Sequence, residues 1–180
     1  MLLRIAITGP ESTGKSLLAE GLAAYYRTAW VPEYAREYLE SLSHPYEEED
    51  ILRIARGQIH SEECQAVDAK GILFCDTELI VTKIWSEVKY GRCHPWIQEQ
   101  IKEHRYDLYL LTAVDLPWEP DPLREHPEMR EKLFSLYHRE LTRLGFPFFV
   151  VSGVGEARLR NAVKSIEGYF SRELLPLGTD

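Results

Sequence analysis

The chain alternates short apolar runs with longer stretches in which apolar residues recur at helical spacing. The runs have the composition of buried parallel strands and occupy residues 2–8, 28–31, 72–77, 107–112 and 146–151. Apolar residues spaced three and four apart predict amphipathic helices between them. These helices are expected after residue 16, from Pro32, and over 51–70, 79–90, 95–102, 129–144 and 159–170. The alternation predicts an α/β fold with a parallel sheet and helices on both faces.

Residues that begin or end helices stand at several predicted boundaries. Pro32 suits the first position of a helix, because its fixed backbone angle is already helical. Gly71, Gly91 and Gly145 follow the last periodic residues of three helices, where glycine commonly ends a helix. Glu33 has two interpretations. Its charge suits a helix N-terminus, and its place after a parallel strand also suits ligand binding.

One stretch near the start carries a motif with a specific chemistry. Residues 9–16 read G-P-E-S-T-G-K-S, which fits the phosphate-binding pattern G-x-x-x-x-G-K-[ST] between a strand and a helix. The glycines let the backbone bend, so that its N–H groups face an anion. We expect Lys15 to reach the β- and γ-phosphates of ATP during catalysis, and Ser16 to ligate Mg²⁺. The expected ATP-binding residues are Gly9, Glu11, Ser12, Thr13, Gly14, Lys15, Ser16 and Leu17, with Gly153 beside the adenine.

The third predicted strand ends in an acid, Asp76. In P-loop proteins such an acid holds Mg²⁺ directly or through water. Its strand then lies beside the P-loop strand, which predicts the five-stranded order 2-3-1-4-5. Glu33 and Arg36 follow the second strand, and ligands bind at the carboxyl ends of strands in open α/β sheets. We therefore expect Glu33, Arg36 and Asp76 to contact the acceptor, and either carboxylate is a candidate base.

Residues 115–130 form the most irregular segment, because four prolines interrupt it. A long loop in a compact domain is commonly functional, and this one follows the fourth strand, where nucleotide kinases carry a lid. Arg124 and Arg130 are expected to stabilise the transferred phosphoryl group. The alternative is that both arginines form surface ion pairs with neighbouring glutamates.

Composition restricts the class of protein. The 180 residues are expected to form one domain, and the net charge of −8 argues against a nucleic-acid or anionic membrane surface. The three cysteines, Cys64, Cys75 and Cys93, form an odd and scattered set, which indicates reduced thiols. No apolar run reaches the length of a membrane span, and no signal peptide is apparent. These features predict a cytoplasmic protein, with the oligomeric state left open, a homo-oligomer included.

Four segments together resemble a known family. They read I-T-G-P-E-S-T-G-K-S, V-P-E-Y-A-R-E-Y-L, F-C-D-T-E and D-L-P-W-E-P-D-P-L-R, and the sequence is similar to the nicotinamide riboside kinase domain of bacterial NadR proteins. The resemblance implies transfer of the γ-phosphoryl group of ATP to the 5′-hydroxyl of nicotinamide riboside. It also implies that Glu33 and Asp76 face the ribose and the metal, and that Trp118 or Tyr34 stacks on the cationic ring. Trp85, by its pattern, is expected in the core.

The resemblance has limits and leaves alternatives open. Pro122 stands where the lid motif is expected to have Gly. We do not expect the adenylyltransferase or DNA-binding functions of NadR proteins, because the resemblance covers only their kinase part. A GTPase is not expected, since no N-K-x-D motif occurs. A kinase of another nucleoside or nucleoside monophosphate, or an ATP-binding regulator without turnover, also fits the P-loop.

Overall fold

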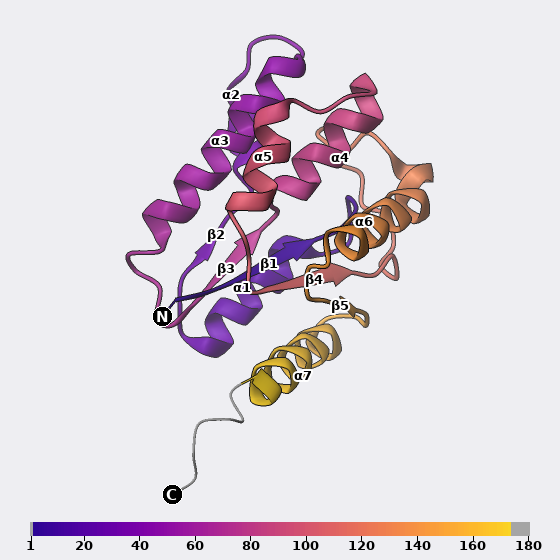
Figure 1. Cartoon of the computed structure of the whole chain (residues 1–180). Helices are drawn as coiled ribbons and strands as arrows, with labels where there is room; N and C mark the ends of the chain where they lie inside the picture. The colour runs from indigo at the N-terminus through magenta and orange to yellow at the C-terminus, as the bar shows by residue number, and fades with distance from the viewer. Residues whose placement is uncertain (1, 174–180) are drawn as a thin grey trace, which may run out of the picture.

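A five-stranded parallel sheet forms the centre of the molecule (Figure 1). The structure is a computed structural model, and it describes residues 2–173. The strands are β1 (Leu3–Thr8), β2 (Trp30–Val31), β3 (Ile72–Asp76), β4 (Leu108–Thr112) and β5 (Phe148–Val151). They lie in the order β2-β3-β1-β4-β5, with every neighbouring pair parallel. This order confirms the prediction, and it places the P-loop strand beside the strand that ends in Asp76.

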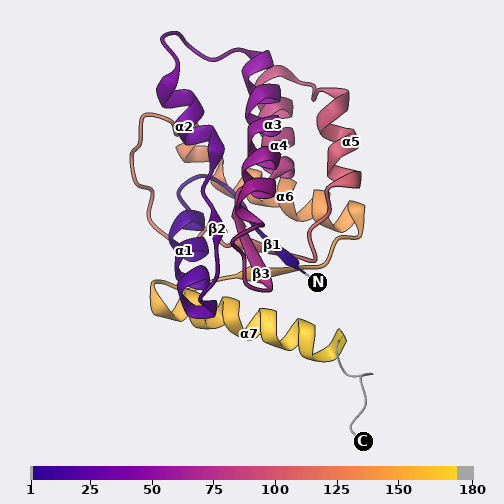
Figure 2. The ribbon, with the colours of Figure 1, turned by 90° about the vertical axis from the view of Figure 1, so that its left-hand side faces the viewer.

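Helices cover both faces of the sheet (Figures 1 and 2). One face carries α1 (Lys15–Tyr26) and α7 (Glu156–Glu173). The other face carries α3 (Glu48–Gln65), α4 (Leu79–Tyr90), α5 (Pro95–Glu103) and α6 (Arg130–Leu144). The short α2 (Tyr34–Ser41) packs on α3, and a 3₁₀ turn, η1 (Pro127–Met129), leads into α6. The carboxyl ends of the strands therefore open toward α2, the start of α4 and the segment before α6.

The core has two halves because successive strand residues point to opposite faces of the sheet. In β1, Ile5 and Ile7 pack with α1 and α7, whereas Ala6 between them packs toward the other helices. All three residues are completely buried. This explains why the strand reads as a nearly continuous apolar run rather than as an alternating one.

Two predicted boundaries were wrong, the start of α2 and the end of α3. Pro32 is not the first residue of a helix, because α2 begins at Tyr34 with Glu33 as its N-cap. The Glu33 side chain makes no capping hydrogen bond. The helix predicted over 51–70 ends at Gln65, where the N–H of Asp68 bonds to the carbonyl of Gln65 in a tighter turn. Val67, which was expected on the apolar stripe, is 85% exposed.

The structure tests two expectations that came from composition. Cys64, Cys75 and Cys93 are free thiols, as the odd and scattered set predicted. Within residues 2–173, no helix combines the length and the apolarity needed to cross a membrane.

Candidate functional site: a phosphate loop facing an acceptor cavity

The loop between β1 and α1 has the backbone shape that the glycine motif predicted. Gly9 and Gly14 adopt φ angles of 136° and 74°, which residues with a side chain rarely adopt. A Cβ atom on Gly9 would also lie 2.5 Å from the Thr112 hydroxyl at the end of β4. That hydroxyl is 2.7 Å from the buried hydroxyl of Thr13. The glycines therefore allow the conformation of the loop, and Thr112 at the end of β4 contacts the loop through Thr13.

Lys15 lies across this loop rather than out in solvent. Its ammonium group donates a hydrogen bond of 2.9 Å to the carbonyl of Pro10. The N-terminus of α1 begins at the same residue, so its free N–H groups face the same space. The site suits the phosphates of a nucleotide because it combines the Lys15 ammonium group, the N-terminus of α1 and the amides of the loop.

A buried arginine from α7 holds the back of the loop. Arg158 is 4% exposed and donates 2.9 Å from Nη1 to the carbonyl of Thr13. Its Nε donates 2.7 Å to the carbonyl of Gly153, and its guanidinium pairs with Asp115. Asp115 in turn accepts the N–H of Gly153 at 2.6 Å. The N–H and the carbonyl of Gly153 are thus both hydrogen-bonded within the protein. Its expected contact with adenine stays a prediction.

Asp76 and Glu33 lie close enough to influence each other. Asp76 is 1% exposed, and burial raises the pKa of its carboxyl group to about 6, with the negative charge of Glu33 adding to the rise. The charge of Lys15 and a hydrogen bond from Ser16 act in the opposite direction. The structure therefore brings together Lys15, Ser16, Glu33 and Asp76 from three separate segments of the chain. This is the grouping that the sequence predicted.

The residue after Asp76 has an uncommon backbone conformation. Thr77 has a φ angle of 71°, and its β-branched side chain is unfavourable there. Such a conformation costs roughly 1–3 kcal/mol and persists only where surrounding contacts hold it. One such contact is the hydrogen bond of 3.0 Å from the Thr77 N–H to the carbonyl of Ile7 in β1.

Ser16 and Asp76 fit a magnesium ion in the way nucleotide enzymes use it. Mg²⁺ takes one or two protein oxygens and completes its shell with water and phosphate oxygens. A hydroxyl and a carboxylate within hydrogen-bonding reach supply this donor set. Among the described residues, no group of three or more His, Cys, Asp or Glu side chains forms a dedicated metal cage. When bound, the ion supplies charge neutralisation at the β- and γ-phosphates.

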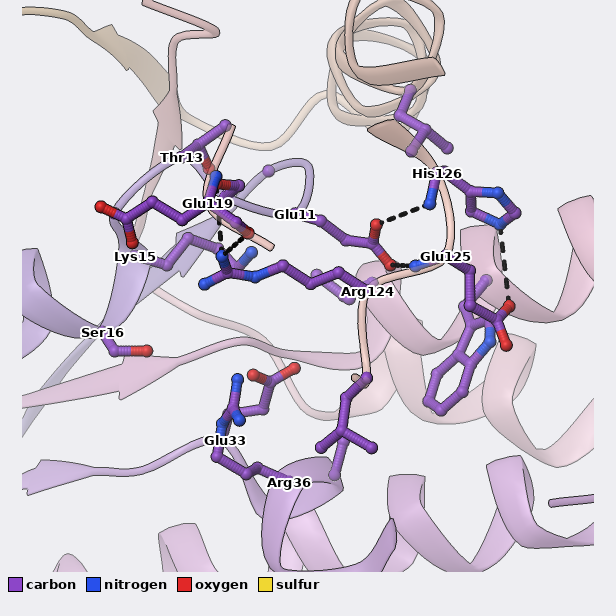
Figure 3. Close-up of a pocket in the computed structure, with 18 of the residues that line it drawn as sticks. Glu11, Thr13, Lys15, Ser16, Glu33, Arg36, Glu119, Arg124, Glu125 and His126 are labelled. Carbon is purple, nitrogen blue, oxygen red and sulfur yellow. Dashed lines mark hydrogen bonds and ion pairs between the residues drawn. The ribbon is translucent and has the colours of Figure 1, made fainter. Parts of the chain in front are cut away.

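A cavity of about 280 Å³ opens in front of the phosphate loop (Figure 3). Its polar side holds Lys15, Ser16, Glu33 and Arg36, with Arg124 entering from the lid. Its apolar side comes from α2, α4 and α6 and consists of Ala35, Leu39, Val81, Ile84, Trp85, Val88, Leu133 and Tyr137. The cavity thus joins a phosphate site to a pocket suited to a small organic acceptor.

The aromatic wall of this cavity differs from the expected one. Trp85 lines it, although its spacing suggested the core. Tyr34 and Trp118 do not occur among the described residues that line it, so their stacking on an acceptor stays a prediction. The Trp85 indole N–H donates 2.8 Å to the hydroxyl of Tyr46, and the two rings meet edge to face. That hydroxyl also bonds to the lid residue Glu125 at 2.9 Å.

The lid is bound to the P-loop through two P-loop side chains. The Glu11 carboxylate accepts the backbone N–H groups of Glu125 and His126 at 3.2 and 3.1 Å (Figure 3). The Ser12 hydroxyl accepts the N–H of Glu119 at 2.9 Å and a guanidinium hydrogen of Arg124 at 3.3 Å. The two residues were expected to bind phosphate; here they hold the lid closed over the loop.

The two lid arginines point to the P-loop rather than to neighbouring glutamates. Arg124 bonds to Ser12 and to the carbonyl of Glu119. Arg130 donates to the carbonyls of Ser12 and Leu116 at 3.1 and 2.9 Å. The alternative of ion pairs with neighbouring glutamates is thus not seen for either arginine, and their role at the transferred phosphoryl group stays a prediction. Arg36 crosses from α2 to the lid, where it pairs with Asp121 at 3.0 Å.

Comparison with known proteins adds sequence and structural relatives. A family model described as an AAA domain, AAA_28, matches residues 4–158. The chain is 33% identical over 126 residues to the "Trifunctional NAD biosynthesis/regulator protein NadR" of Escherichia coli strain K12. The match covers 67% of this chain and 30% of that protein. The corresponding protein of Salmonella typhimurium gives the same identity and coverage. The chain therefore spans about a third of the length of these relatives.

Solved structures share the fold. A NadR protein in complex with NR superposes with a TM-score of 0.75 and 23% identity, covering 93% of this chain and 51% of that one. A thymidylate kinase from Ehrlichia chaffeensis superposes with a TM-score of 0.65 and 13% identity, covering 93% and 98%. The chain therefore shares its fold with these proteins, one of which is a thymidylate kinase.

Proposed function

The chain belongs to the AAA_28 family of AAA domains, and from that premise we propose that it is an ATP-dependent kinase of nicotinamide riboside. The reaction would move the γ-phosphoryl group of ATP to the 5′-hydroxyl of the riboside, giving nicotinamide mononucleotide and ADP. One observation carries the proposal. A single cavity joins the phosphate loop to the Glu33 carboxylate and, at its other end, to an aromatic wall.

The donor half of the mechanism uses the P-loop. Backbone amides and Lys15 would hold the β- and γ-phosphates, and Ser16 and Asp76 would hold a magnesium ion, which would neutralise phosphate charge. Arg124 and Arg130, which lie against Ser12, supply positive charge beside the transferred group. The closed lid excludes water, which would otherwise compete with the acceptor for the phosphoryl group.

The acceptor half uses Glu33 and the apolar wall. Glu33 lines the cavity beside Lys15, so its carboxylate is placed to orient the hydroxyl or to take its proton. Asp76 has the raised pKa of a buried acid and remains the other candidate base. A cationic pyridinium ring suits the other end because the aromatic residue Trp85 lines the cavity there, while the neighbouring Glu125 carboxylate is already paired with Lys89 at 3.0 Å.

The charge of the cavity favours a nucleoside over a nucleoside monophosphate. A monophosphate acceptor requires free cationic groups on the acceptor side. Arg36 is the cation there, and it is already paired with Asp121 and with Glu40. The relatives support the same choice, since one is named an NAD biosynthesis/regulator protein and a structural relative was solved in complex with NR.

The test is ADP release from ATP and Mg²⁺ with a panel of acceptors. The panel contains nicotinamide riboside, the common nucleosides and their monophosphates, and a parallel series contains EDTA. We expect strong stimulation by nicotinamide riboside alone, lost when EDTA removes the metal. Stimulation by another nucleoside would support the proposed kinase activity but contradict nicotinamide riboside as the substrate. Tight ATP binding without stimulation by any acceptor would contradict the kinase and favour an ATP-binding regulator.

A further inference from the structure

Two polar residues interrupt the apolar stripe of α3. The buried side of this helix carries Ile51, Ile54 and Ala55, and the same spacing continues to Gln58 and Glu62. Gln58 is 2% exposed and Glu62 is completely buried. Burying a polar group costs free energy of folding unless hydrogen bonds satisfy it. The contacts of Gln58 and Glu62 therefore indicate the role of each side chain.

The Gln58 amide bridges the two segments that carry the acceptor-site carboxylates. Its Oε1 accepts the backbone N–H of Tyr34, the residue after Glu33, at 3.0 Å. Its Nε2 donates to the backbone carbonyl of Thr77, the residue after Asp76, at 3.2 Å. One side chain thereby connects the start of α2 to the end of β3.

The amide has only one orientation that satisfies all its partners. Nε2 also donates to Glu62 Oε1 at 3.2 Å, so it faces a carboxylate and a carbonyl, both of which only accept. A flipped amide would turn its oxygen toward both acceptors and its NH₂ group toward the N–H of Tyr34. The Glu62 carboxylate is itself fixed by the Tyr106 hydroxyl at 2.7 Å and by His104 Nε2 at 2.8 Å.

We propose that Gln58 is a positioning residue, which holds Glu33 and Asp76 at their working separation through the backbones of Tyr34 and Thr77. The inference rests on the proposed kinase function for its kinetic consequence. Asp76 is also held by a hydrogen bond from Ser16 and by the pairing of β3 with β1, whereas Gln58 is the side chain that bonds to the segments of both carboxylates. Glu33 makes no capping hydrogen bond, and Asp76 precedes the strained Thr77. Gln58 does not line the cavity, so it acts on turnover through these neighbours and not through the substrate.

The test compares Gln58→Met with Tyr106→Phe. Both variants remove one hydrogen bond from the buried Glu62, but only Gln58→Met releases Tyr34 and Thr77. For Gln58→Met we expect kcat to fall about a hundredfold, because misplacement of reacting groups by about 1 Å has effects of that size. The KM for ATP should stay within about threefold. Tyr106→Phe should lower the melting temperature while leaving kcat within about threefold of the wild type.

Crystal structures of both variants provide a readout that does not depend on turnover. We expect Glu33 or Asp76 to be displaced in Gln58→Met and unmoved in Tyr106→Phe. Unmoved carboxylates in Gln58→Met, or equal losses of kcat in the two variants, would overturn the proposal. If Gln58→Met does not fold, Gln58→Asn replaces it, since its amide is one methylene too short to span both segments.

The outcomes separate this inference from the proposed function. A wild-type protein that phosphorylates no nucleoside contradicts the kinase, and the carboxylate positions in the variant structures still decide the role of Gln58. If the wild-type protein phosphorylates nicotinamide riboside and Gln58→Met is unimpaired, the kinase function stands. In that case Gln58 has no part in the mechanism.

Discussion

The two ends of the cavity are built in different ways. The phosphate end comes from one continuous loop, residues 9–16, whose backbone and lysine form the site. The acceptor end is assembled from α2, α4 and the lid with the helix α6 that follows it, three regions that lie far apart in the sequence. The phosphate end therefore depends on local backbone geometry, and the acceptor end depends on how helices pack. Substitutions that separate donor from acceptor effects test this difference.

The largest effect is expected at the phosphate end, from Lys15→Ala. Removing this cation should lower kcat about a thousandfold, since phosphoryl transfer depends on electrostatic stabilisation by groups already in place. Steady-state ADP release measures the loss. Lys70→Ala, which removes an exposed lysine far from the loop, should behave as wild type. A Lys15→Ala variant with near-normal kcat would show that the loop does not act on the transferred group.

The next largest effect is expected from Glu33→Gln at the acceptor end. It should lower kcat on the order of a hundredfold, because the amide cannot accept a proton from the hydroxyl. Binding of a non-hydrolysable ATP analogue, measured by calorimetry, should stay unchanged. Glu37→Gln, one helical turn further along α2 and exposed, is the matched control. Full activity in Glu33→Gln would leave Asp76 as the base or no base at all.

Trp85→Ala should act on acceptor binding alone. Loss of the aromatic wall is expected to raise the KM for the acceptor about tenfold, the size of a stacking or cation–π contact. The KM for ATP should not change. Trp118→Ala decides between the two candidate rings, because Trp118 packs on Arg130, with the guanidinium 5.7 Å from the ring centre. A larger acceptor KM in Trp118→Ala than in Trp85→Ala would restore the assignment made from resemblance.

The smallest effect is expected where the two ends meet, at Glu11. Glu11→Gln weakens two hydrogen bonds to the lid backbone and should raise the population of open lid about fivefold. Limited trypsin digestion, followed by the rate of cleavage after Arg124, measures this population. Glu20→Gln, at an exposed position of α1, should be cleaved at the wild-type rate. Unchanged cleavage in Glu11→Gln would mean that the Glu11 contacts do not hold the lid.

The sequence predicted those parts of the molecule whose structure depends on residues that are neighbours in the chain. The strand–loop–helix around Lys15 and the acid at the end of β3 need only neighbouring residues to be recognised, and from them the strand order followed. Trp85 was missed because a wall residue and a core residue occupy the same spacing on an amphipathic helix. Its place on the cavity depends on tertiary contacts, among them the Tyr46 hydroxyl that bonds both to Trp85 and to the lid residue Glu125.

Gln58 and Glu62 could have been recognised as buried polar residues from their positions in the sequence. They continue the apolar spacing of α3, and a polar residue at a core position indicates either a satisfied buried group or a functional one. What the sequence could not give is the partner. The contacts to Tyr34 and Thr77 join residues 24 and 19 positions away, and they exist only once helix and sheet have docked.

Arg158 has a consequence for how this protein is made. Its guanidinium reaches the carbonyl of Thr13 from 145 residues further along the chain. During synthesis the P-loop leaves the ribosome before the arginine that contacts it, which follows only with α7. The nucleotide site of the nascent chain therefore stays incomplete until α7 has been synthesised and has docked on the sheet.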